Sequence, residues 1–137
     1  MSVVRFSISL EKELVKEFDR YLKVKGYSNR SEAVRDLVRK VLVEEEWEAN
    51  KYVYAAITIV YDHTQREAVD RITDIQHEYH KNIISAQHVH IDEKNCLEII
   101  AVKGRAEEIR KLYDRLEREK KIKHIAIARS TAGERLI

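Results

Sequence analysis

The chain opens with a short stretch in which apolar and polar side chains alternate. In "VVRFSISL", the odd and even positions would lie on opposite faces of an extended segment, because successive side chains of a strand point to opposite sides. This period of two predicts a half-buried β-strand. Its apolar face would carry Val4, Phe6 and Ile8, and its polar face Arg5, Ser7 and Ser9.

Helical spacing replaces this alternation in the next forty residues. In "EKELVKEFDRYLKVKGY", Leu14, Phe18 and Leu22 recur every fourth residue, which indicates an amphipathic helix, and Gly26 suits its C-terminal end. A second apolar stripe runs through "SNRSEAVRDLVRKVLVEEEWE", for which Ser28 is a plausible N-cap. Residues 2–46 are therefore predicted to form a strand–helix–helix unit.

The remaining chain alternates between β-rich and helical patterns. Strands are predicted at 52–61, 82–91, 96–104 and 122–130, and helices at 64–80, with Thr64 as cap, and 106–120. The order β-α-β-β-α-β is that of the ferredoxin-like split βαβ fold. The predicted class is thus α+β. We expect domains at 1–47 and 52–130, followed by a flexible tail at 131–137.

The composition of the chain bears on its cellular compartment and its kinds of partner. Charged residues make up 36% and apolar residues 44%, but the net charge is only +2, so bulk charge does not indicate a nucleic-acid partner. A single cysteine excludes an intrachain disulfide and fits a reducing compartment. No apolar run approaches membrane-spanning length, and no signal peptide is visible. We expect a cytoplasmic protein without a membrane partner.

The N-terminal strand needs a partner, and the same strand of a second copy is the simplest one. Such a two-stranded ribbon fits the DNA major groove, where Arg5, Ser7 and Ser9 could contact base edges. The amides at the start of the second helix could hold a phosphate, with Arg30 nearby. Alternatively, the polar face is simply solvated. The strand–helix–helix layout and "GYSNRSEAVRDLVR" resemble the ribbon-helix-helix repressors, which favours DNA binding. The candidate DNA-binding residues are Arg5, Ser7, Ser9, Asn29, Arg30 and Ser31.

A second cluster of reactive residues lies in "SAQHVHIDEKNC". His88 and His90 would share one face of a strand, and hairpin pairing could bring Cys96 near them. His77 and His80 lie on the preceding helix. These residues could merely be solvated, but together they favour a metal site. Their nitrogen and sulfur donors suit Zn, Cu, Ni or Co, and their spacing does not choose among these metals.

The spacing His77-x10-His88-x-His90-x5-Cys96, behind a ribbon-helix-helix unit, resembles the NikR family of nickel-responsive transcriptional regulators. That resemblance implies an ACT-like regulatory domain in which His88, His90 and Cys96 of one subunit and His77 of a neighbour bind Ni(II) in a square plane. It also implies a homotetramer, a dimer of dimers, that represses a nickel-uptake gene through an inverted-repeat operator.

Several further residues are candidates beside these ligands. Glu98 would lie on the same strand face as Cys96 and could support a ligand histidine. The resemblance implies a hard cation near Glu32 and Asp36; alternatively, these carboxylates are simply solvated near Arg35 and Arg39. His63 and His80 are candidates for a secondary metal site. The chain also departs from the family: "HEYH" replaces a longer histidine run, and Ser7 and Ser9 stand where threonine is common.

Two other functions compete with this interpretation. The regulatory domain could sense another metal or a small molecule such as an amino acid, because topology does not determine function. An enzyme would require Cys96 as nucleophile with a histidine base. The chain has only three glycines and shows no oxyanion-hole motif, so we expect that it is not an enzyme.

Overall fold

The computed structural model describes residues 2–137. The chain packs as two units, one ending at Val41 and the other spanning Leu42–Ile137. The division lies inside a helix, so the last turns of that helix belong to the second unit.

Residues 2–11 form no regular strand in the single chain. Their apolar side chains are largely open to solvent, with exposures of 82% for Val4, 76% for Phe6 and 70% for Ile8. A strand is defined by backbone pairing, and the predicted partner is a second copy. The predicted ribbon therefore lies beyond what one chain can form.

Two helices follow in this first unit, α1 (Lys12–Lys25) and α2 (Arg30–Glu48). Gly26 ends α1 in the left-handed region, at φ 77°, and its N–H bonds back to the last turn. The predicted N-cap of α2 was one residue early. Asn29, not Ser28, accepts a hydrogen bond from the Glu32 N–H on its side-chain oxygen, at 2.9 Å.

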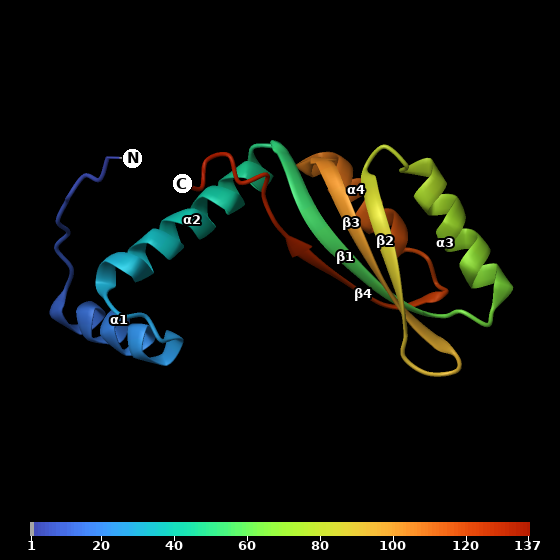
Figure 1. Ribbon diagram of the computed structural model, residues 1–137, viewed down its shortest axis with the longest axis horizontal. Helices are drawn as coiled ribbons and strands as arrows, with labels where there is room; N and C mark the ends of the chain where they lie inside the picture. The colour runs from blue at the N-terminus through green and yellow to red at the C-terminus, as the bar shows by residue number, and fades with distance from the viewer. Residues whose placement is uncertain (1) are drawn as a thin grey trace. The chain divides into compact units, whose positions relative to one another are not determined.

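The second unit has the predicted β-α-β-β-α-β order (Figure 1). Its strands pair antiparallel in the order β2-β3-β1-β4, which is the ferredoxin-like arrangement. The elements are β1 (Tyr52–Asp62), α3 (Arg66–Glu78), β2 (Ile83–His90), β3 (Asn95–Arg105), α4 (Ala106–Glu117) and β4 (Ile122–Arg129). Thr64 does not cap α3: Gln65 holds the N-cap position, and the Thr64 hydroxyl donates to Asp62 instead.

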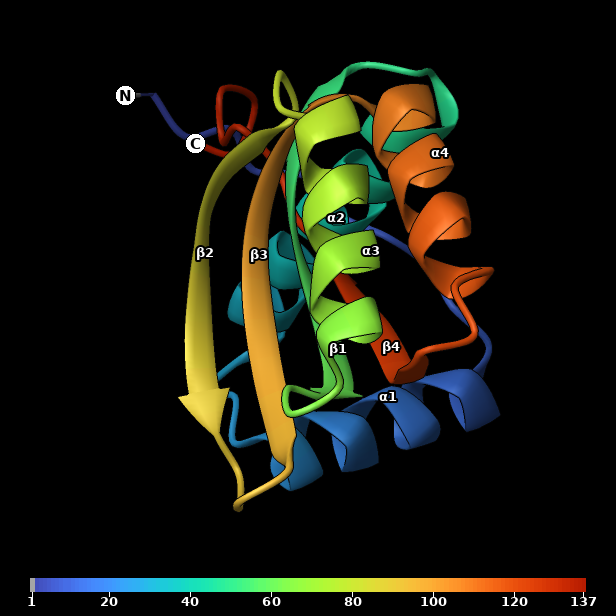
Figure 2. The same cartoon turned by 90° about the vertical axis from the view of Figure 1, so that its right-hand side faces the viewer.

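Both helices of this unit lie on the same face of the sheet (Figure 2). Every second side chain of β1 and β3 is buried, and those between are partly buried or exposed; the buried set packs against α3 and α4. The opposite face of the sheet has no helix over it in the second unit. It carries partly buried, mostly apolar side chains such as Ile99, Leu97 and Val60.

The segment after β4 makes side-chain contacts with the end of α2. Thr131 donates a hydrogen bond to Glu46 at 2.7 Å, and Arg135 lies 2.8 Å from Glu45. The Trp47 indole N–H also donates to the Ser130 carbonyl at 2.9 Å. The C-terminal segment therefore packs with the second unit. No helix among residues 2–137 is long and apolar enough to cross a membrane.

Candidate functional site

The hairpin of β2 and β3 brings the candidate metal ligands onto one side of the sheet. His90 lies opposite Cys96, and His88 lies opposite Glu98, in the antiparallel register. Side chains of directly opposed residues lie on the same face. This face is also the one covered by α3 and α4, because Cys96 and Glu98 are both 1% exposed. The histidines lie on β2, at the edge of the sheet, and are exposed.

One imidazole nitrogen is already close to the thiol. His88 Nδ1 lies 3.7 Å from Cys96 Sγ. A divalent metal with bonds of about 2.0–2.1 Å to nitrogen and about 2.3 Å to sulfur would hold the two donors roughly 3.1–3.6 Å apart. The observed separation is close to this range. The pair therefore fits a shared metal ion after a small side-chain shift.

A buried carboxylate also lies near His88. Glu98 Oε1 lies 3.7 Å from His88 Nδ1 and accepts a hydrogen bond from the Tyr61 hydroxyl at 2.9 Å. Gln76 of α3 donates to the other carboxylate oxygen, Glu98 Oε2. Burial, together with the bond to Glu98, raises the pKa of Tyr61 above its usual value, so the hydroxyl stays protonated and donates. Both carboxylate oxygens are thus held in place by donors.

Tyr61 and Gln76 were not identified from the sequence. Tyr61 could have been found, because strict alternation from Ile57 and Ile59 places it on the covered face of β1. Gln76 precedes His77 directly, but only the packing of α3 against the sheet reveals its contact with Glu98.

The other expected ligands lie further from this pair. The His90 ring stacks edge-on against His63, with 5.1 Å between ring centroids. His77 is exposed on α3, and its carbonyl oxygen lies 3.0 Å from Nδ1 of His80. Across residues 2–137, no three His, Cys, Asp or Glu side chains are grouped closely enough to hold a metal ion. Within residues 2–137, the single chain therefore does not bring the four expected ligands together.

His63 has an unusual environment among these histidines. Its Nε2 is buried and makes no hydrogen bond within residues 2–137. Buried polar atoms of this kind normally have partners, so an unpaired ring nitrogen beside His90 is chemically open to a ligand.

The candidate DNA-binding residues lie in the first unit, in two groups. Arg5, Ser7 and Ser9 are exposed within the extended N-terminal segment. Asn29, Arg30 and Ser31 surround the start of α2, where Asn29 caps the helix. Arg30 is not free in the single chain, since its guanidinium lies 2.9 Å from Asp19, and this ion pair lowers the pKa of the Asp19 carboxyl.

The two carboxylates expected to hold a cation each have a hydrogen-bond donor. Glu32 accepts from the Ser28 hydroxyl at 2.6 Å, and Asp36 accepts from the Tyr27 hydroxyl at 2.8 Å. The bond to Asp36 raises the pKa of Tyr27 to about 12. A cation between the two carboxylates would have these hydroxyls as its neighbours.

Comparison with known proteins agrees with this arrangement. Residues 54–129 match the family described as the NikR C-terminal nickel-binding domain, and residues 4–45 match the ribbon-helix-helix proteins of the copG family. The chain belongs to the NikR family. It is a nickel-responsive transcriptional regulator with a ribbon-helix-helix DNA-binding domain and a nickel-binding C-terminal domain, and it is not an enzyme. Its cofactor is Ni(II). The predicted family, fold class and general function are confirmed.

Relatives of similar length support this membership. A protein of Pyrococcus furiosus is 46% identical over 138 residues and covers 100% of both chains. A protein of Caldanaerobacter subterraneus is 47% identical over 135 residues, which is 98% of this chain and 88% of the relative. Each is named as a candidate nickel-responsive regulator.

One solved structure is similar in fold to part of this chain. An uncharacterized protein of Thermotoga maritima superimposes with a TM-score of 0.52 at 14% identity, covering 58% of this chain and 98% of that protein. At this identity the likeness shows the fold and not the function.

Proposed function

We propose that this NikR-family chain is a homotetrameric, nickel-dependent repressor that acts in the cytoplasm on an inverted-repeat operator of a nickel-uptake gene. The observation that carries the proposal is the His88–Cys96 pair, with donors 3.7 Å apart at the exposed edge of the sheet. Two neighbouring donors with a second histidine, His90, opposite the thiol form a donor set that suits the binding and sensing of a metal such as Ni(II).

The proposed Ni(II) ligands are His88, His90 and Cys96 of one subunit and His77 of another. His77 is a suitable donor for a neighbouring chain because it is exposed on α3, away from the donor pair of its own chain. A bound metal would link two subunits, because three of its ligands would come from one subunit and His77 from the other. Tyr61 and Gln76 would hold the Glu98 carboxylate beside His88, where it would accept a hydrogen bond from whichever ring nitrogen does not bind the metal.

The proposed secondary sites use residues outside this set. His63 and His80 are candidates for an additional metal, since His63 has an open ring nitrogen beside His90. Glu32 and Asp36 are candidates for a hard cation. Neither site is required for the main proposal, and their loss would leave nickel binding at Cys96 intact.

Assembly is supported by two uncovered apolar surfaces. The N-terminal segment exposes Val4, Phe6 and Ile8, which a second copy would cover in a paired ribbon. The second unit exposes the side of its sheet opposite α3 and α4. We expect the same surface of further copies to pack there, because large apolar surfaces on a free protein usually mark an association site.

DNA recognition would follow from the paired ribbon. Arg5, Ser7 and Ser9 of two copies would enter the major groove, and the start of α2 at Asn29, Arg30 and Ser31 would contact a phosphate. To bind a phosphate, the Arg30 guanidinium would have to break its ion pair with Asp19 or contact both groups at once. Two such ribbons in a tetramer would read two half-sites related by symmetry, which gives an inverted repeat.

Nickel can regulate such a protein only by binding one arrangement of the subunits more tightly than another. A coupling free energy of about 3 kcal/mol would raise operator affinity roughly 150-fold. The test is binding of the full chain to promoter DNA of a nickel-uptake gene, with and without one equivalent of Ni(II) per chain. Equal affinity under both conditions would contradict the proposal.

Variants separate the two functions. His88→Ala or Cys96→Ala should remove the nickel–thiolate absorption band and the nickel effect on DNA, whereas Arg5→Ala should weaken DNA binding and leave the band unchanged. His124→Ala is the matched control, since this exposed histidine lies on β4, at the far edge of the sheet. If His124→Ala removed the band and His88→Ala did not, the assigned ligands would be wrong.

A further inference from the structure

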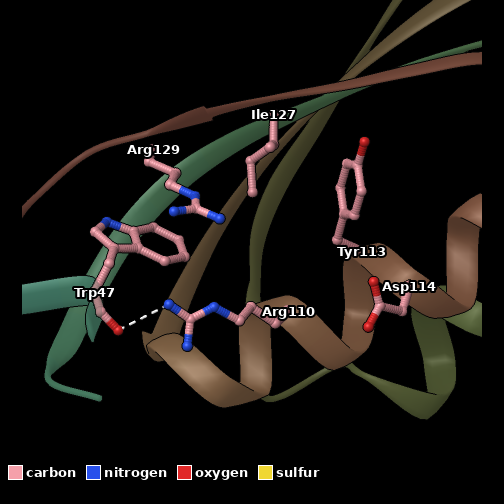
Figure 3. A pocket seen from close by; sticks show the side chains of 6 residues that line it. All are labelled: Trp47, Arg110, Tyr113, Asp114, Ile127 and Arg129. Atoms are coloured by element: carbon pink, nitrogen blue, oxygen red, sulfur yellow. Dashed lines mark hydrogen bonds between the residues drawn. The ribbon is translucent and has the colours of Figure 1, made fainter. Parts of the chain in front are cut away.

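A cavity of about 350 Å³ opens in the second unit, well apart from the hairpin that carries the metal ligands. Its walls come from the end of α2, the helix α4 and the edge strand β4 (Figure 3). The volume is within the range of pockets that hold small molecules. The lining residues are Trp47, Arg110, Tyr113, Asp114, Ile127 and Arg129.

Two guanidinium groups converge on one aromatic wall of this cavity. Arg129 lies 5.0 Å and Arg110 6.0 Å from the centre of the Trp47 indole ring. Arg110 also donates to the Trp47 backbone carbonyl at 2.9 Å, which fixes it in place. The indole itself is rigid, because it is 1% exposed and its N–H donates to Ser130. The positive groups are therefore held at the cavity rather than free in solvent.

Asp114 provides a charge of the opposite sign at a separate point of the wall. It lies on the side of the opening away from Trp47 (Figure 3). Among residues 2–137, no ion pair joins Asp114 to Arg110 or Arg129. The cavity thus offers two cations and one anion that do not neutralise each other directly. The apolar side chain of Ile127 and the ring of Tyr113 also line the cavity.

We propose that this cavity binds a small α-amino acid with an apolar side chain. The carboxylate of the ligand would lie against Arg129 and Arg110, since guanidinium groups match carboxylates in geometry and charge. The ammonium group would lie against Asp114, and the side chain against Ile127, Tyr113 and the indole. The lining carries one more positive than negative charge, so a carboxylate is essential and an amine alone is disfavoured.

The consequence is a second ligand site, distinct from the nickel site, on the helix α2. Trp47 lies in the last turn of α2, the helix whose first residues are the candidate phosphate contacts. A ligand bound at Trp47 would therefore contact an element shared by both units of the chain. The site requires none of the residues assigned to nickel, so it can be tested independently of the proposed metal function.

The test uses the full-length protein and L-leucine as probe. Trp47 is the only tryptophan of the chain, so its fluorescence reports on this cavity alone. We expect a saturable fluorescence change with L-leucine, matched by heat in isothermal titration. 4-Methylpentanoate, which lacks the ammonium group, should bind at least about tenfold more weakly, and 3-methylbutylamine, which lacks the carboxylate, more weakly still.

Variants assign the groups. Arg129→Ala should reduce L-leucine affinity at least about tenfold, and Asp114→Asn should bring L-leucine close to the affinity of 4-methylpentanoate. Both variants should bind Ni(II) like the parent, which reports an intact second unit. The control is Arg118→Ala, an exposed arginine just after α4 that does not line the cavity.

Three results would overturn the proposal. One is the absence of saturable binding of L-leucine by both methods at millimolar concentration. Another is unchanged affinity in Arg129→Ala, and the last is equal binding of L-leucine and 3-methylbutylamine. None of these results would affect the nickel and DNA measurements, so a failure here leaves the proposed repressor function standing.

Discussion

At the residue scale, the decisive feature is a carboxylate buried beside the candidate metal ligands. Glu98 is 1% exposed, and burying a charge without partners is costly. Tyr61 and Gln76 each donate a hydrogen bond to one of its oxygens. Removing either donor leaves part of that charge unsatisfied, so these residues should matter both for stability and for the orientation of His88.

Tyr61→Phe tests this arrangement. The variant keeps the ring and loses only the hydroxyl that donates to Glu98, so we expect the free energy of unfolding to fall by about 1–3 kcal/mol. Nickel affinity should fall as well, because His88 loses part of its support. Denaturant unfolding and a nickel titration measure the two effects.

Tyr54→Phe is the matched control for that substitution. Tyr54 lies on the same strand as Tyr61 but on the opposite face, where it is 37% exposed. The same chemical change should therefore leave both unfolding and nickel binding nearly unchanged. If the two variants behaved alike, the hydroxyl of Tyr61 would have no particular role at Glu98.

How much of the site could be predicted depends on how local each contact is. The positions of His88, His90 and Cys96 on one face follow from the period of two and a short turn, both of which are local in sequence. Gln76 reaches Glu98 across 22 residues through helix packing, which no period in the sequence encodes. The cavity at Trp47 was missed for the same reason, because its walls come from three separate elements.

At the element scale, the tight turn between β2 and β3 sets the register that aligns the candidate ligands. Asp92 accepts hydrogen bonds from the backbone N–H and side-chain amide of Asn95 and from the backbone N–H of Lys94. These bonds lower the pKa of the Asp92 carboxyl to about 2. A one-residue slip in this turn would move His88 and His90 to the opposite face, so the turn is part of the site.

The hydrogen bonds to Asp92 in this turn should make the stability of the protein depend on pH. The pKa of Asp92 is lower in the folded than in the unfolded protein. Its contribution to the free energy of unfolding is therefore complete above the usual pKa range of a carboxyl group, and it is lost as the pH falls toward 2. In Asp92→Asn, the loss of stability between about pH 4 and pH 2 should be smaller than in the parent. Unfolding free energies measured across this range test the difference.

The neighbouring residue provides the control. Glu93→Gln removes a carboxyl group one position further along the same exposed turn. It should leave the acid profile of the parent largely intact. A profile of Asp92→Asn that coincides with the parent would mean that the hydrogen bonds at this turn do not stabilise the fold.

Helices and strands were predicted well where the hydrophobic period of the segment alone specifies the element. They were predicted less well where packing or a second chain determines the structure. The alternation of β1 and the helical period of α4 each specify one element, and the structure agrees. The helix N-caps were predicted less accurately, because several consecutive polar residues can occupy the N-cap position and packing selects among them, as with Ser28 and Asn29. The N-terminal strand depends on a second molecule.

At the scale of the whole molecule, the uncovered side of the sheet is the surface on which the proposed assembly depends. Ile99→Lys places a charge at its centre, and burying that charge against another copy would be unfavourable. We expect the particle mass measured by light scattering to fall below that of the parent. Nickel affinity should fall with it, if His77 of another chain is a ligand.

A lysine placed elsewhere distinguishes this effect from general disturbance. Ala132→Lys introduces the same charge in the exposed segment after β4 and should leave the mass unchanged. A far-ultraviolet dichroism spectrum like that of the parent would show that Ile99→Lys still folds. An unchanged mass for a folded Ile99→Lys protein would exclude this side of the sheet as the contact surface.

The burial of Cys96 gives the protein a built-in chemical reporter. It is the only thiol in the chain and it is 1% exposed, so an alkylating reagent can reach it only when the β2 edge opens. The rate of labelling at Cys96 therefore measures how often the β2–β3 hairpin opens locally, without background from other cysteines. The same shielding keeps the thiol away from other molecules, so oxidants should cross-link this protein into disulfide dimers only slowly.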